Sequence, residues 1–120
     1  MKKFILASGV SLLTIAGGLG AAQAASVSTS EMVTICNDTG NVSSQNFCNG
    51  YAQGVYDMYV ASIHPKKNPA YVCFPEPGPS REAAIKGYVA WASKATQYSS
   101  LPAADSMMRY LATTYPCKKK

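Results

Sequence analysis

Few side chains in this sequence could carry out a reaction: one histidine, six acids, and serines and cysteines as nucleophiles. A nucleophilic enzyme needs a serine or cysteine beside a general base. The histidine, His64, comes directly before Pro65 and seven residues after Asp57, a spacing that lets both side chains share a helix face. A Ser–His–Asp set is an open alternative, but the pattern favours a solvated histidine at a helix end. The scattered acids suggest no carboxylate pair for glycoside cleavage. We expect no catalytic residue and no enzyme activity.

The four cysteines indicate disulfides rather than a metal site. No two have C-x-x-C spacing, the histidine is adjacent to none of them, and no C-x-x-C-H haem-attachment motif is present. An even number of cysteines in a short exported chain is typical of two disulfides, with three possible pairings. The methionines could bind a soft metal, but three lie on predicted buried stripes, which favours core packing. We expect no metal and no cofactor. The cysteines are Cys36, Cys48, Cys73 and Cys117, and the methionines are Met32, Met58, Met107 and Met108.

The first 24 residues have the features of a cleaved signal peptide. Lys2 and Lys3 precede an apolar or small-residue run from Phe4 to Leu19, and Ala22-Gln23-Ala24 supplies the A-x-A cleavage pattern. The run is too short and too rich in glycine and serine for a convincing membrane span. We predict export to the periplasm with cleavage near Ala24, no integral membrane segment, and a single domain over residues 25–120.

Charge argues against a nucleic-acid partner. Without Lys2 and Lys3 the chain has nine basic and six acidic residues, a net charge of +3. Three of the basic residues, Lys118 to Lys120, form a terminal run that should be solvated. A nucleic-acid-binding domain concentrates more positive charge on one face. We therefore expect no nucleic acid among the partners.

Helical signals organise the chain, and strand signals are weak. Ser28 and Glu31 form a capping-box pattern before a short helix predicted from about Ser30 to Cys36. The turn-rich segment 37–44 connects it to a second helix, predicted from Ser43 or Ser44 to about Ile63. The buried stripe of the second helix is predicted at helical spacing and consists of Phe47, Tyr51, Val55 and Met58.

A proline-rich loop separates these helices from a second pair. Residues 64–80 contain five prolines and a glycine, which exclude regular structure. Such a long loop is usually functional or pinned in place. Ser80 should cap a third helix, and a fourth should open at Pro102. These signals predict an all-α fold, a small disulfide-stapled bundle of about four helices. The predicted buried faces are Ile85, Tyr88, Val89, Ala92 and Ala95 on the third helix and Ala104, Met107, Met108, Leu111 and Tyr115 on the fourth.

Two helical hairpins predict the disulfide pairing. Cys36 ends the first helix, and Cys48 lies in the first turns of the second. Cys73 precedes the third helix, and Cys117 follows the fourth. Antiparallel hairpins bring such ends together, so we predict the bonds Cys36–Cys48 and Cys73–Cys117.

Gly50 and Gly54 are unusual inside a helix, because each weakens it by roughly 1 kcal/mol relative to alanine. They lie one turn apart on one side of the second helix. Absent side chains let another helix approach closely. We therefore interpret both glycines as helix-packing positions rather than as part of a catalytic or ligand site.

The order of these motifs resembles the Rap/Tai family of exported immunity proteins. The segments "FCNGYAQGVYD" (47–57), "CFPEP" (73–77) and "LPAADSMMRYLATTYPC" (101–117) match the family's F-C-x-G-Y-x-x-G-x-x-D helix, C-x-P loop and last helix closing in aromatic-Pro-Cys. The likeness covers nearly all of residues 25–120. Two segments depart from the family pattern: "ATQYSS" (95–100) stands where an H-P pair is usual, and 64–72 looks particular to this chain. The matching positions are Cys48, Gly50, Tyr51, Gly54, Asp57, Cys73, Pro75, Leu101 to Ala104, Pro116 and Cys117.

The resemblance implies a periplasmic immunity protein that protects the cell from a peptidoglycan amidase delivered by the type VI secretion system. It implies a papain-like Cys–His amidase as the partner, inhibited by a plug in its active-site cleft, and a helical homodimer. The G-x-x-x-G face or the third helix could supply the dimer contact. The alternative hypothesis is a periplasmic stress chaperone, which would also be small, helical and disulfide-linked. Six acids and one histidine give this chain little means of responding to acid.

The surface expected to bind the partner is the 64–80 loop with the exposed side of the third helix. A proline-stiffened, tethered loop loses little ordering entropy on entering a cleft. The alternative is an ordinary solvated loop with Phe74 tucked into the core. Among the tyrosines, a residue type that suits interfaces, Tyr56, Tyr59 and Tyr71 are predicted on the surface. The predicted contact residues are Lys66, Lys67, Tyr71, Phe74, Glu76, Arg81, Glu82 and Lys86.

Overall fold

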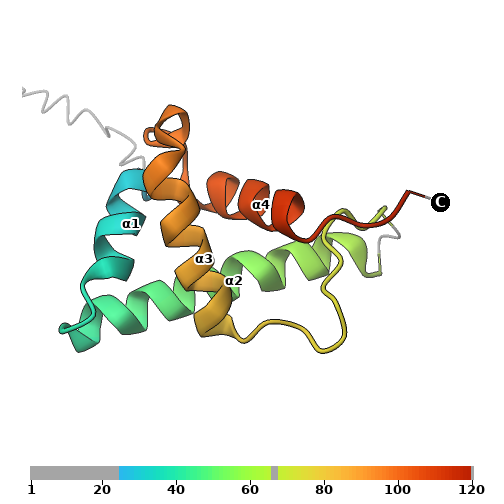
Figure 1. The fold of residues 1–120 in the computed structure, drawn as a ribbon, viewed down its shortest axis with the longest axis horizontal. Coiled ribbons are helices and arrows are strands. Elements are labelled where there is room, and N and C mark those ends of the chain that lie inside the picture. Colours follow the sequence, from blue (N-terminus) through green and yellow to red (C-terminus); the bar gives the residue numbers. More distant parts are fainter. Residues whose placement is uncertain (1–24, 66–67, 120) are drawn as a thin grey trace, which may run out of the picture.

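The structure is a computed structural model that describes residues 25–65 and 68–119. Within these residues it has four α-helices and no strand, which confirms the predicted all-α class. The predicted signal peptide lies outside the described residues. Figure 1 shows the long helix α2 with α1 at its start, α3 crossing it and α4 beside its second half. The elements are α1 (Thr29–Asn37), α2 (Val42–Ile63), α3 (Arg81–Lys94), the 3-10 turn η1 (Thr96–Tyr98) and α4 (Ala103–Thr114).

Side-chain caps begin three of the helices and account for their boundaries. The predicted capping box is present: Glu31 N donates to Ser28 Oγ (3.3 Å), and Ser28 N donates to Glu31 Oε2 (2.8 Å). Hydrogen bonds from Ser28 lower the pKa of the Glu31 carboxyl. Asn41 caps α2 by accepting from Ser44 N (3.1 Å), so this helix begins slightly before the predicted serines. Ser80 caps α3 as predicted.

The core lies where the four helices meet, and each helix contacts the other three. Backbone hydrogen bonds tie the start of α1 to the start of α4. Thr29 N donates to Leu101 O, and Ala103 N donates to Val27 O, both at 2.8 Å. The buried cluster consists of Met32, Cys36, Cys48, Tyr88, Ala92, Ala103, Met107 and Tyr110.

The buried face of α2 differs from the predicted stripe. Phe47 and Met58 are 46% and 71% exposed, and their neighbours Cys48 and Tyr59 are buried instead. One residue along a helix is a rotation of about 100°. The disulfide bond from Cys36 in α1 holds Cys48 toward the core, and Phe47, one residue earlier, therefore faces solvent.

The buried face of α4 is also rotated relative to the prediction. Pro102 caps this helix rather than opening it. The predicted stripe included only one of the buried positions, Met107, because it lay about one residue away from the face that meets the other helices. The buried residues are Ala103, Ser106, Met107 and Tyr110, and the predicted positions Ala104, Met108, Leu111 and Tyr115 are only partly buried.

The glycine that permits a close approach is Gly87 in α3. A Cβ atom at Gly50 or Gly54 would meet nothing within 4 Å, so neither glycine serves packing among the described residues. A Cβ atom at Gly87 would overlap the Tyr110 hydroxyl and lie 3.0 Å from its ring carbon Cζ. Tyr110 is only 6% exposed and packs against Tyr88 at a ring-centroid distance of 6.1 Å, so its hydroxyl would have to shift to admit a methyl group at position 87.

Replacing Gly87 by alanine should lower the free energy of unfolding by about 1–3 kcal/mol, because overpacking a buried contact outweighs the gain in helix propensity. Urea unfolding followed by helical circular dichroism measures the change. The matched control is Gly40→Ala in the turn between α1 and α2, where a Cβ atom also meets nothing within 4 Å; it should leave stability unchanged or raise it by up to about 1 kcal/mol. Adding Tyr110→Phe to Gly87→Ala should recover part of the loss. Equal stabilities of the two alanine variants would contradict the close contact at Gly87.

Candidate partner-binding surface

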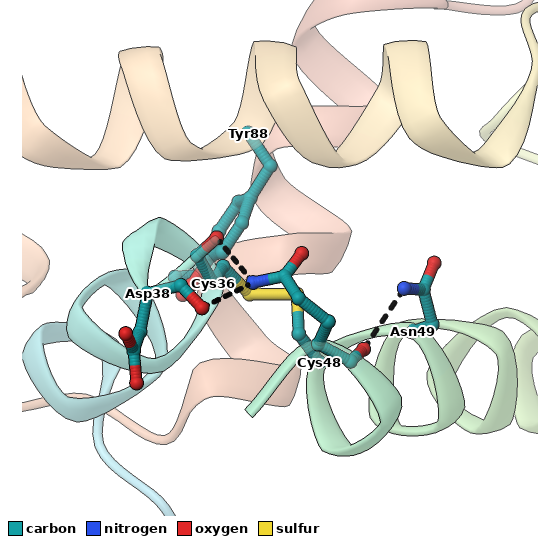
Figure 2. The surroundings of a disulfide bond; sticks show 7 residues. Cys36, Asp38, Cys48, Asn49 and Tyr88 are labelled. Carbon is teal, nitrogen blue, oxygen red and sulfur yellow. Dashed lines mark hydrogen bonds between the residues drawn. A yellow bond between two sulfur atoms is a disulfide. The ribbon is translucent and has the colours of Figure 1, made fainter. Parts of the chain in front are cut away.

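Both predicted disulfides are present. Cys36 is bonded to Cys48 and Cys73 to Cys117, with Cα–Cα distances of 5.3 and 4.8 Å. Figure 2 shows the first bond between the end of α1 and the start of α2, with Tyr88 reaching toward it from α3. This bond is buried and fixes the α1–α2 hairpin. The second bond fixes the 64–80 loop to the segment after α4.

Polar contacts from α2 close the end of α1. Gln45 Nε2 donates to the carbonyl oxygens of Cys36 (3.2 Å) and Asp38 (3.0 Å), and these contacts satisfy acceptors that a helix end leaves free. Asn49 Nδ2 in turn donates to Gln45 O (2.8 Å) (Figure 2). The polar side chains at this end of the bundle therefore bind the backbone of the same chain.

Tyr59 holds the middle of the 64–80 loop. Its hydroxyl accepts from the backbone N–H groups of Tyr71 and Val72, both at 3.0 Å. Beside the disulfide, Cys73 N donates to Tyr115 O at 2.8 Å. Tyr59 is 5% exposed, so its prediction as a surface residue is wrong. Its phenol is buried because it satisfies two backbone donors of a loop that has no regular structure to pair them.

The two aromatic residues of the loop have different environments. Tyr71 is 49% exposed, and its ring meets Tyr59 edge-on at 4.8 Å. Partial burial, with Tyr59 nearby, raises the pKa of Tyr71. Phe74 is half-buried, with its ring 4.8 Å from that of Tyr115 and 5.5 Å from that of Tyr56. Phe74 therefore packs the loop onto the bundle, and Tyr71 is the aromatic residue that the loop offers to solvent. Tyr56, whose ring meets that of Phe74, is half-buried.

The structure brings only part of the predicted contact set together. Phe74 and Arg81 line one cavity, which joins the loop to the start of α3. The predicted residues Glu76, Glu82 and Lys86 are exposed on the loop and on the first turns of α3. Lys66 and Lys67 lie outside the described residues. Tyr71 lines a separate hollow.

The cavity has a volume of about 220 Å³ and lies between α2, the loop, α3 and α4. Ala52 and Ala84, on two different helices, leave space that larger side chains would fill. The lining is apolar or aromatic except for Gln53, Ser80 and Arg81. Burial raises the pKa of Tyr110, another lining residue. The sequence did not indicate this cavity, because it arises where three helices and a loop meet; the small side chains of Ala52 and Ala84 are its only trace in the sequence.

The second hollow is broader, at about 610 Å³, and its lining contains no charged residue. Gly54 and Met58 of α2 line it, together with Tyr71 of the loop and Met108 of α4. With Met58 71% exposed, this part of the surface is apolar and open to solvent.

Asp57, in α2, and His64, at its end, are the two residues that the sequence suggests for a Ser–His–Asp set. Asp57 Oδ1 accepts from Gln53 Nε2 at 2.8 Å, and both Asp57 and His64 are exposed. Among residues 25–65 and 68–119, no group of three His, Cys, Asp or Glu residues could hold a metal ion. What this surface can offer a partner is shape, apolar area and charge.

Residues 28–117 match a known protein family, from the cap of α1 to the last disulfide cysteine; its members are the Rap1a immunity proteins. The chain belongs to this family. The matched span of this Rap1a-family protein includes all four helices, both disulfides and the 64–80 loop. The match confirms the resemblance drawn from the motifs and indicates immunity against a secreted effector. No curated protein and no solved structure matches the chain.

Proposed function

We propose that this Rap1a-family protein is a periplasmic, non-enzymatic inhibitor that binds a type VI secretion peptidoglycan amidase and occludes its active-site cleft. Family membership supports an immunity function. The observation that carries the finer proposal is the covalently tethered loop with exposed Tyr71 beside an exposed helix start. Because the disulfide and Tyr59 already order this loop, its entry into a cleft costs little conformational entropy.

The two disulfides support an exported location, since such bonds persist in the periplasm and are rare in the cytosol. We propose that residues 1–24 are removed on export and that residues 25–120 form one domain. In the part of the chain that the structure describes, no helix has the length and hydropathy needed to cross a bilayer.

We also propose a homodimer that uses the face of α2 containing Gly50, Gly54 and Met58. Gly50 and Gly54 present open backbone there, and Met58 is exposed beside them. Contiguous exposed apolar surface is typical of protein–protein contacts. In this arrangement the two glycines admit a helix of the second copy rather than of the same chain.

The test of the inhibitor function uses the amidase encoded beside this gene, assayed by release of fragments from purified peptidoglycan. Wild-type protein should abolish release near equimolar ratio. Replacing residues 66–71 by a Gly-Ser segment should weaken inhibition by at least about 30-fold, because loss of a hot-spot contact costs about 2 kcal/mol or more. Helicity and melting temperature should stay nearly unchanged.

The matched control is a Gly-Ser replacement of Thr39 and Gly40, in the turn at the opposite end of α2, which should inhibit fully. Full inhibition by a folded 66–71 variant would overturn the loop assignment and move the contact to the α2 face around Phe47 and Met58. Failure of the wild-type protein to inhibit would overturn the amidase as the partner.

A further inference from the structure

The cavity of about 220 Å³ adjoins the proposed contact surface and has the walls of a side-chain pocket. An engineered cavity of about 150 Å³ lined by apolar side chains binds benzene. The larger space here suits one bulky apolar side chain such as leucine, methionine or phenylalanine. The apolar wall includes Ala52, Val55, Phe74, Ala84, Ile85 and Leu111.

Arg81 supplies the charge at the rim of the cavity. It is the one charged residue in the lining, and it is exposed. Among the described residues no carboxylate lies within 4.0 Å of the Arg81 side chain. The ion pair in this part of the chain is elsewhere and joins Arg109 to Asp105. A guanidinium group binds carboxylates through two parallel hydrogen bonds. A ligand that presents a carboxylate beside an apolar side chain would therefore match both parts of the cavity.

We propose that this cavity receives one large apolar side chain of the bound effector, and that Arg81 pairs with a carboxylate next to that side chain. The inference rests on the proposed function and names the chemistry of the effector segment. Phe74 makes the cavity continuous with the loop that contacts the effector. A second copy would dock on the neighbouring hollow, whose lining is uncharged and includes Gly54 and Met58; Val55 borders both hollows.

The first experiment uses two small probes, N-acetyl-phenylalanine and its uncharged amide, titrated into isotope-labelled protein and followed by NMR. N-acetyl-phenylalanine should shift the amide signals of Ala84, Ile85 and Leu111 with a dissociation constant on the order of 1 mM, the range expected for so small a ligand. The amide should bind several-fold more weakly. Arg81→Gln should remove that difference between the two probes.

Filling the cavity provides the matched pair of variants. Ala84→Phe places a ring in the space. It should abolish the probe shifts and weaken inhibition of the effector by at least about 30-fold. Ala83→Phe adds the same ring at an exposed position outside the lining and should preserve both. Melting temperature checks that each variant folds, and Ala52→Met, which fills the cavity from α2, replaces Ala84→Phe if that variant does not.

Three results would overturn the proposal: no saturable shifts at the cavity, probe shifts that survive in the filled variants, or full inhibition by a folded filled variant. Light scattering provides a further check. If Ala84→Phe converts a dimer to a monomer, the occupant of the cavity is a second copy, and the assignment of the cavity to the effector is wrong. If the probes bind the cavity but wild-type protein does not inhibit the amidase, the proposed function fails, and the amidase is excluded as the occupant. If wild-type protein inhibits while the probes do not bind, the function stands and the cavity proposal fails.

Discussion

Replacing Cys73 and Cys117 by serine should lower the free energy of unfolding by about 4 kcal/mol. The bond links residues 44 positions apart, so its loss returns a large amount of conformational entropy to the unfolded chain. Serine is accommodated in the folded state because Cys73 is exposed and Cys117 only partly buried. For a domain of this size the melting temperature should fall by roughly 15–30 °C. Urea unfolding, followed by helical circular dichroism without reductant, measures the loss.

The comparison variant removes the other bond. Cys36 and Cys48 are 12 positions apart, and the shorter loop gives an entropic loss of about 3 kcal/mol. Both are buried, so alanine is the replacement that avoids adding a hydroxyl to the core. In the Cys73/Cys117 variant the loop keeps its hydrogen bonds to Tyr59, so native helicity should persist in the absence of urea. A loss below about 1 kcal/mol would contradict the stabilising role assigned to the loop disulfide.

Replacing Ser106 by alanine should lower the free energy of unfolding by about 2–3 kcal/mol. The Ser106 hydroxyl is fully buried and joins three elements. It donates to the carbonyl of Ala103 (3.1 Å), accepts from Thr29 Oγ1 (2.7 Å) and shares a hydrogen bond with the Tyr88 hydroxyl (2.8 Å). Burial raises the pKa of Tyr88, which keeps its hydroxyl protonated as a donor. Alanine removes the 2.8 Å partner of the buried Tyr88 hydroxyl.

Second substitutions distinguish the two donors to Ser106. The Thr29 hydroxyl lies 2.9 Å from the carbonyl of Leu101 and can turn to it, whereas the Tyr88 hydroxyl loses its 2.8 Å partner when Ser106 is replaced. Ser106→Ala with Tyr88→Phe should therefore be more stable than the sum of the single changes predicts, by about 1–2 kcal/mol, and Ser106→Ala with Thr29→Val should be nearly additive. Ser93→Ala, an exposed hydroxyl bonded within its own helix, is the control and should change stability by less than about 0.5 kcal/mol. Additive losses for the Ser106–Tyr88 pair would contradict the network.

The candidate surface was partly predictable from the sequence. The loop and the start of α3 do adjoin, because Ser80 both ends the loop and caps the helix. Tyr71 is exposed as predicted. The sequence did not indicate that Phe74 and Tyr59 face inward, since their positions depend on where the loop crosses α2 and on the residues at the far end of the chain to which it is bonded.

By itself, the sequence determined the four helices, the caps at Ser28 and Ser80, and the disulfide pairing of this protein. Capping and proline signals act on backbone only a few residues away, so their effects can be predicted from the local sequence. Here they are Ser28 with Glu31, Ser80, and the stop at His64-Pro65. The order of the cysteines around two hairpins then left one simple pairing, and the same ordered motifs carried the family resemblance.

Only the tertiary structure decided which side of each helix is buried. A stripe of apolar residues defines a face to within about one residue, and one residue is a rotation of about 100°. Contacts between distant segments select within that range: Cys48 rather than Phe47 faces the core, Ser106 becomes a buried hydrogen-bonding centre, and Gly87 rather than Gly50 or Gly54 meets a neighbouring helix. The cavity beside Arg81 has the same origin, because an empty volume depends on how separate helices approach one another and not on any one segment of sequence.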